Sequence, residues 1–129
     1  MSYVKRIIQF LKGNRNIRAT IKDDNVLNFG LSLAMEFGSN WQKPTQCRLK
    51  QKYPCFTNME LNIIDKICRD AMSFSHNTIY ALVESKGKDF DKENTIKTIR
   101  DKYPWIDSKN INHLMSQGLY YSYKDGLQW

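Results

Sequence analysis

The sequence predicts an all-α protein, a single compact bundle of five to six helices. Three observations lead to this prediction. Residues 57–85 separate polar and apolar side chains onto two faces when they are wound at the period of an α-helix. Residues 24–41 are apolar nearly all round, as in a helix buried at the centre of a bundle. Helix caps, glycines and prolines divide the rest of the chain into shorter helical segments.

The longest predicted helix is an amphipathic spine helix over about 57–85. Thr57 and Glu60 stand at the positions of a capping box, in which each side chain satisfies a backbone amide of the first turn. Lys86 and Gly87 mark the end, because a cation suits the last turn and glycine accepts the left-handed conformation that follows. An apolar face this wide needs other helices to cover it. It consists of Leu61, Ile63, Ile64, Ile67, Cys68, Ala71, Met72, Phe74, Ile79, Leu82 and Val83.

The predicted buried helix, residues 24–41, follows two aspartates, Asp23 and Asp24, that are both suitable N-caps. Gly30 and Gly38 lie two turns apart and would permit close approach of another helix. Glu36 is a charged residue on an otherwise apolar segment. We therefore expect a Lys or Arg nearby to pair with it.

Periodicity and caps predict four shorter helices, over about 3–12, 44–52, 92–103 and 108–124. Pro44 suits a first turn, and Asp91 and either Asp107 or Ser108 suit N-caps. Gly126 is placed to cap the end of the last helix. Residues 15–22 have no clear period and form a predicted linker. The expected organisation is a basic N-terminal arm, residues 1–22, followed by a helical bundle domain, residues 23–129.

A ten-residue pattern occurs twice, fifty residues apart. Residues 49–58 read LKQKYPCFTN and residues 99–108 read IRDKYPWIDS, and each segment leads into a longer helix. The shared pattern is a short helix, Lys-Tyr-Pro, a hydrophobic pair and a cap. It fits two ordinary proline-terminated helical corners, and it also fits an internal duplication.

The charge of the chain is unevenly distributed. The 129 residues carry a net charge of +7, and residues 1–22 contain no acidic side chain. Clustered cations interleaved with aromatic residues can contact a phosphate backbone, although no helix-turn-helix, zinc-finger or RNA-binding signature accompanies them. The candidate nucleic-acid residues are Lys5, Arg6, Lys12, Arg15, Arg18, Lys22, Lys43, Arg48, Lys50 and Lys52.

Several classes of site lack their signatures in this sequence. The spacing of Cys47, Cys55, Cys68, His76 and His113 matches no zinc pattern, and no glycine-rich phosphate loop occurs. We therefore predict no cofactor and no metal. The three cysteines form no disulfide framework, and no stretch resembles a secretory signal or a membrane span. A cytoplasmic location is the expectation.

The remaining candidates are polar and aromatic groups on two predicted helix faces. Tyr120, Tyr123 and His113 project from the last helix, and Ser73, His76 and Tyr80 share the polar side of the spine helix. Exposed tyrosines with mixed polar neighbours are typical of protein interfaces. The leading hypothesis is a small non-catalytic adaptor-type domain that binds a protein partner or a second copy of itself. A nucleic-acid-binding protein is the alternative. A hydrolytic enzyme would require a pocket at His76 or His113 with a carboxylate in reach.

Overall fold

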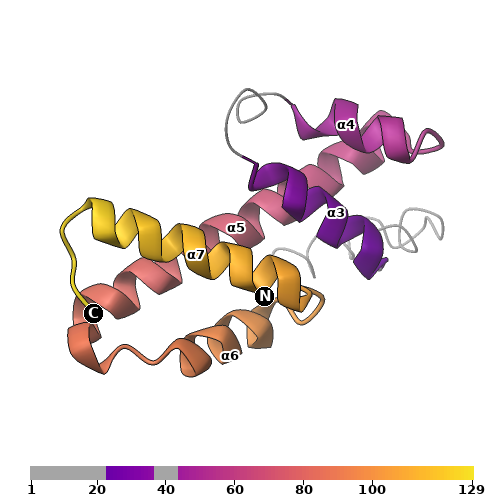
Figure 1. Ribbon diagram of the computed structural model, residues 1–129. Helices are drawn as coiled ribbons and strands as arrows, with labels where there is room; N and C mark the ends of the chain where they lie inside the picture. The colour runs from indigo at the N-terminus through magenta and orange to yellow at the C-terminus, as the bar shows by residue number, and fades with distance from the viewer. Residues whose placement is uncertain (1–22, 37–43) are drawn as a thin grey trace. The chain divides into compact units, whose positions relative to one another are not determined.

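The computed structural model describes residues 23–36 and 44–129, and these residues form an all-α fold (Figure 1). The prediction of the fold class is thereby confirmed. The described residues contain five α-helices, a short 3-10 helix and no strand. The helices are α3 (Asp24–Ala34), α4 (Thr45–Lys52), α5 (Asn58–Lys86), α6 (Lys92–Lys102) and α7 (Ser108–Lys124), and the 3-10 helix is η2 (Gly87–Asp89). The predicted helix at 3–12 and the predicted linker lie outside the described residues.

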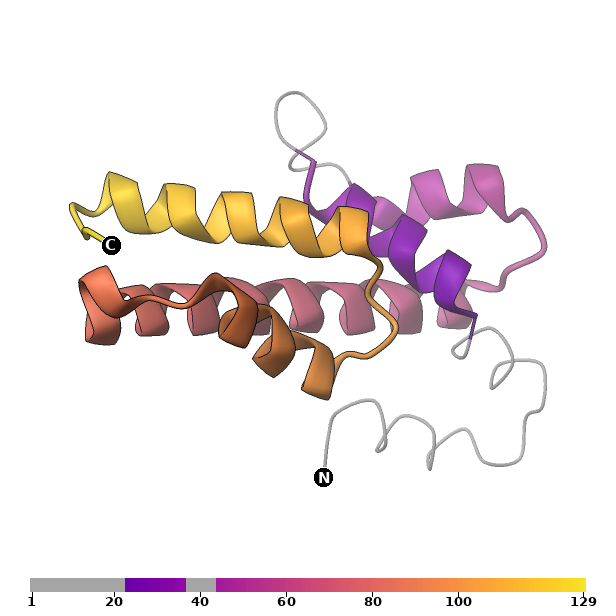
Figure 2. The ribbon, with the colours of Figure 1, turned by 60° about the horizontal axis from the view of Figure 1, so that its bottom comes forward.

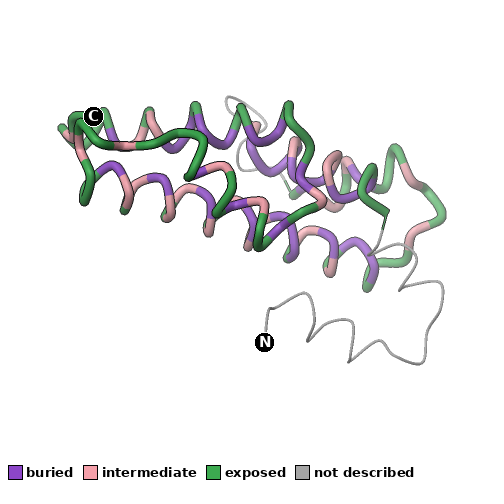
Figure 3. Tube along the Cα trace, turned by 90° about the horizontal axis from the view of Figure 1, so that it is seen from below, coloured by how far each residue is buried: buried purple, intermediate pink, exposed green. Residues whose placement is uncertain are grey.

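The chain divides into two compact units, and the boundary lies within α5. The first unit ends at Asp70 and the second is Ala71–Trp129. Helix α5 therefore supplies its first half to one unit and its second half to the other. Buried residues recur along α5 and α7 at helical spacing, so that each helix turns one side inward (Figure 3).

Helix α5 is the predicted spine helix, and its capping box is present. The Thr57 amide donates to Oε1 of Glu60 at 2.9 Å, and the Glu60 amide donates to the Thr57 hydroxyl at 3.2 Å. The helix ends at Lys86, and Gly87 follows with a φ of 49°. The prediction is confirmed to within a residue at each end.

In the first unit, α3 starts where the sequence predicts and ends earlier. The Asp23 carboxylate caps it by accepting from two backbone amides of the first turn. The last helical residue is Ala34, so the prediction of one helix as far as 41 is wrong at residues 35 and 36, while 37–43 lie outside the described residues. The mostly apolar sequence has no glycine or proline at residue 35 or 36 that could have placed this end. Glu36 has the predicted cationic partner, since its carboxylate pairs with Arg48 at 2.6 Å.

The core of the first unit is formed where α3 meets α5. Gly30 faces Cys68 and Ile64, and the buried Cys68 thiol donates to the carbonyl oxygen of Leu27 at 3.2 Å. Burial raises the pKa of this thiol, which stays protonated and acts as a small apolar group.

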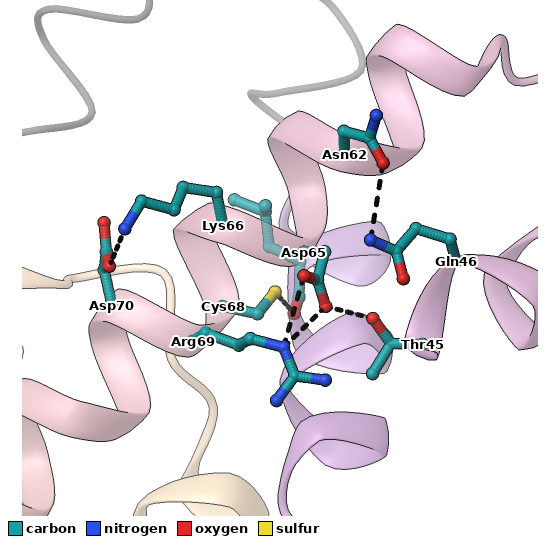
Figure 4. A network of polar contacts seen from close by, with 9 residues as sticks. Thr45, Gln46, Asn62, Asp65, Lys66, Cys68, Arg69 and Asp70 are labelled. Carbon is teal, nitrogen blue, oxygen red and sulfur yellow. Dashed lines mark hydrogen bonds and ion pairs between the residues drawn. The ribbon is translucent and has the colours of Figure 1, made fainter. Parts of the chain in front are cut away.

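Polar contacts join α4 to α5 beside this core. The buried Thr45 hydroxyl donates to the Asp65 carboxylate, which also accepts from Nε of Arg69 at 3.0 Å (Figure 4). Asp65 thus satisfies a hydroxyl from α4 and a cation one turn along its own helix.

In the second unit, α6 runs back along α5, and α7 then runs parallel to the second half of α5 (Figure 2). Asp91 caps α6 and Asp107 caps α7. Each carboxylate accepts one hydrogen bond, from the backbone amide three residues further along the chain. Gly126 ends α7 with a φ of 83°, and the Leu127 amide then reaches back to the Ser122 carbonyl at 3.0 Å. These caps are at the predicted positions.

The repeated Lys-Tyr-Pro segments have nearly the same conformation. Tyr53 has φ −126° and ψ 73°, and Tyr103 has φ −128° and ψ 72°. In each unit the ammonium group of the corner's lysine lies over a phenylalanine ring of the helix that precedes the short helix. Lys52 is 4.2 Å from the ring centre of Phe29, and Lys102 is 4.1 Å from that of Phe74.

The tyrosine rings repeat this geometry as well. The Phe29 and Tyr53 rings meet edge to face at 5.9 Å, and the Phe74 and Tyr103 rings do so at 5.6 Å. The similarity therefore extends beyond the ten residues to a third helix in each unit, α3 or the second half of α5. Each unit is a helix, a short helix, a Lys-Tyr-Pro corner and a further helix. This shared architecture favours duplication over two unrelated corners.

Candidate interaction site

The candidate site lies in the second unit, where α7 packs against the second half of α5. The two helices approach closely because Gly118 has no side chain. A Cβ at this position would come within 2.7 Å of Ile79, which is fully buried. The same approach brings polar side chains of α5 and α7 into hydrogen-bonding distance.

His76 from α5 and His113 from α7 both contact the amide of Gln117. Nε2 of His76 lies 2.9 Å from Oε1 of Gln117, and Nε2 of His113 lies 3.5 Å from the amide nitrogen. This orientation of the amide gives His76 a proton on Nε2, since that nitrogen must donate, and leaves a lone pair on Nε2 of His113. Gln117 is buried, His76 is half-buried and His113 is exposed.

The environment of His76 favours the neutral imidazole. Burial lowers the pKa of His76, while the hydrogen bond to Gln117 raises it and the nearby His113 lowers it again. The ring of Tyr121 meets the imidazole edge to face at 5.3 Å and excludes water from one side. His76 is therefore an uncharged donor or ligand at neutral pH.

One turn further along α5, Tyr80 is held by the end of α7. Its hydroxyl donates to the Asp125 carboxylate at 2.8 Å, and this bond raises the pKa of Tyr80. Tyr120 stands beside Tyr121, with ring centres 5.9 Å apart. Contacts between the two helices therefore involve His76 and Tyr80 of α5, while His113 and Tyr120 join this group through Gln117 and Tyr121 of their own helix.

The most exposed aromatic residues of the described chain lie in the last turns of α7 and just beyond its end. Tyr120 is 56% exposed, Tyr123 is 72% exposed and Trp129 is 44% exposed. Tyr123 and Trp129 line a shallow depression of about 310 Å³ together with Leu127 and Gln128. Ser73 is also exposed.

Four residues of this site were missing from the sequence-based set: Gln117, Tyr121, Asp125 and Trp129. Gln117 follows His113 by one helical turn, so this spacing could have indicated the pair. The contact with His76 could not be predicted, because it depends on the way α7 packs against α5. Trp129 follows the Gly126 cap, and nothing in the sequence indicates how far it is exposed.

Three of the ten candidate nucleic-acid residues, Arg48, Lys50 and Lys52, are among the described residues. Lys5, Arg6, Lys12, Arg15, Arg18, Lys22 and Lys43 lie outside the described residues. The other three hold partners within the first unit. Arg48 pairs with Glu36, Lys50 donates to the carbonyl oxygen of Phe56 at 2.6 Å, and Lys52 lies over Phe29.

The described part of the chain also bears on the other kinds of site considered from the sequence. Cys47 and Cys55 are exposed free thiols. Within residues 23–36 and 44–129, no three side chains of His, Cys, Asp or Glu gather closely enough to hold a metal ion. An amide, not a carboxylate, lies beside both imidazoles. None of the described helices is both long and apolar enough to cross a membrane.

Comparisons of the chain with protein-family models, with curated proteins and with solved structures find no match.

Proposed function

We propose that this protein is a non-catalytic, adaptor-type protein-binding domain whose contact surface is the α7 side of the second unit. The observation that carries the proposal is the distribution of exposed large hydrophobic residues. The described residues contain four, and three of them, Tyr120, Tyr123 and Trp129, lie within the last ten residues. Met59 is the fourth.

Aromatic residues of this kind suit an interface. A tyrosine ring supplies a large contact area at low conformational cost, and its hydroxyl tolerates water at the rim. The hydrogen bonds of Tyr80 and His76 fix the surface beside them, so that a partner would meet a largely preformed site. The partner is another protein or a second copy of the chain.

The direct test places a photo-crosslinking amino acid at position 123, with position 59 as the matched control. Met59 is 54% exposed and lies in the first unit, outside the proposed surface. Any crosslink formed at position 59 would therefore result from exposure alone. We expect a discrete crosslinked product, either with a second copy or with another protein, at position 123 and not at 59. Equal products at the two positions would contradict the proposal.

A second experiment replaces the side chains of the predicted interface residues with alanine. Alanine at Ser73, His76, Tyr80, His113, Tyr120 and Tyr123 should abolish the association, measured by light scattering or by crosslinking. Circular dichroism shows whether the variant remains folded. A folded variant with every association unchanged would refute the proposal.

Nucleic-acid binding stays the alternative, and the same samples test it. Binding through the basic residues would respond steeply to salt and would be lost when the six basic residues of the arm are neutralised. Because Arg48, Lys50 and Lys52 already have partners in the first unit, they favour this alternative less than their charge suggests.

A further inference from the structure

The sequence contains two histidines, and the fold brings both of them to one side chain. His76 and His113 are 37 positions apart and come from different helices. Nε2 of each ring nevertheless lies within 3.5 Å of the amide group of Gln117. The two ring nitrogens therefore lie at the two ends of one amide group, His76 at its oxygen and His113 at its nitrogen.

This arrangement supplies three donors of the kind that transition metals bind. Neutral imidazole nitrogen is a common ligand of Zn²⁺, Ni²⁺ and Cu²⁺, and a carboxamide oxygen can complete a set in which water takes the remaining positions. Gln117 is only 4% exposed, so its oxygen is held in place. His113 is exposed, and its ring can turn towards an ion beside His76 without disturbing the core.

We propose that His76, His113 and Gln117 form a binding site for a single divalent transition-metal cation of the Zn²⁺ class. His76 binds through Nε2 after its proton has moved to Nδ1, His113 binds through its Nε2 lone pair, and Gln117 binds through Oε1. The Tyr121 ring, also from α7, packs against the His76 imidazole and holds it in place. This inference goes beyond the proposed function, and it is measured on the free chain without any partner.

The test is a titration with Zn²⁺ alone, in a chain carrying Cys47→Ser and Cys55→Ser so that exposed thiols do not compete. Imidazole nitrogen NMR resolves both histidines, because the chain has two. We expect both rings to shift together at one ion per chain, with Nε2 as the bound nitrogen in each. A shift of the exposed His113 alone, or of neither ring, would overturn the proposal.

Three variants sharpen the result. His113→Ala should weaken binding roughly tenfold or more, because a chelated ion loses one of its two imidazoles. Gln117→Glu keeps the shape and replaces a neutral oxygen with an anionic one, so it should tighten binding roughly tenfold. Ser116→Ala, at an exposed position of the same helix, is the control and should change nothing. Unchanged affinity in both His113→Ala and Gln117→Glu would show adventitious binding and refute the site.

Discussion

Replacing Gly118 with alanine tests whether the approach of α7 to α5 is as close as the structure shows. The new Cβ would lie 2.7, 2.8 and 2.9 Å from Cδ1, Cγ2 and Cβ of Ile79. Ile79 is β-branched and fully buried, and its Cβ is fixed to the backbone, so it cannot turn away. The helices themselves must shift.

The magnitude follows from two opposing effects. Overpacking of this kind costs about 2–3 kcal/mol, in the upper part of its usual range because three atoms are too close. Alanine gains about 1 kcal/mol over glycine within a helix. We therefore expect Gly118→Ala to lower the free energy of unfolding by about 1–2 kcal/mol. Urea unfolding followed by circular dichroism measures this difference.

A double-mutant cycle with Ile79→Ala identifies the cause. Removing the Ile79 side chain beyond Cβ deletes two of the three clashes and leaves a cavity that the new methyl group partly fills. In that background Gly118→Ala should stabilise the chain, with a coupling energy of about 2 kcal/mol or more. A coupling near zero, or a stabilising single Gly118→Ala, would refute the inferred contact.

Three further predictions concern single contacts. Asp107→Ala should cost about 1 kcal/mol because the start of α7 loses its cap, and Asp107→Asn should restore most of it, as measured by thermal unfolding. Arg48→Ala should cost about 1 kcal/mol at low salt and less at high salt, where its pair with Glu36 is screened; a loss independent of salt would assign the effect to packing instead. Burial lowers the pKa of His76, so the unfolded chain binds this proton first as the pH falls. The stability that depends on His76 is therefore complete above about pH 6.5 and declines below it, and His76→Gln should flatten this decline in urea unfolding at pH 8, 6.5 and 5.

Local signals in the sequence were sufficient for most helix boundaries. The Thr57 and Glu60 pair, the Asp107 cap and the Gly126 stop each act within a few residues, so their effect can be read without the fold. The end of α3 at Ala34 could not be predicted in this way. Its apolar sequence continues past the helix, and the pairing of Glu36 with Arg48 depends on where α4 packs.

The candidate site was predictable in its residues and not in its contacts. Helical spacing placed Tyr120 and Tyr123 away from the buried face of α7, and both are exposed. The link between His76 and His113 arises from packing between two helices distant in sequence, so the spacing of Gln117 from His113 could indicate that pair but not the contact of Gln117 with His76.

The position of the boundary between the two units within α5 has a consequence for cleavage of the chain. Multidomain proteins usually carry an exposed linker between their parts, and proteases cut there first. Here Ile67, Cys68 and Ala71, on either side of the junction, are all fully buried within a continuous helix. A protease therefore has no linker to attack at the junction, whereas the exposed Lys88, inside the second unit, lies between α5 and α6. A cut there would leave the whole of α5 on the N-terminal fragment and separate α6 and α7 from it, so the second unit would lose its partner helix while the first unit would keep its own half of α5.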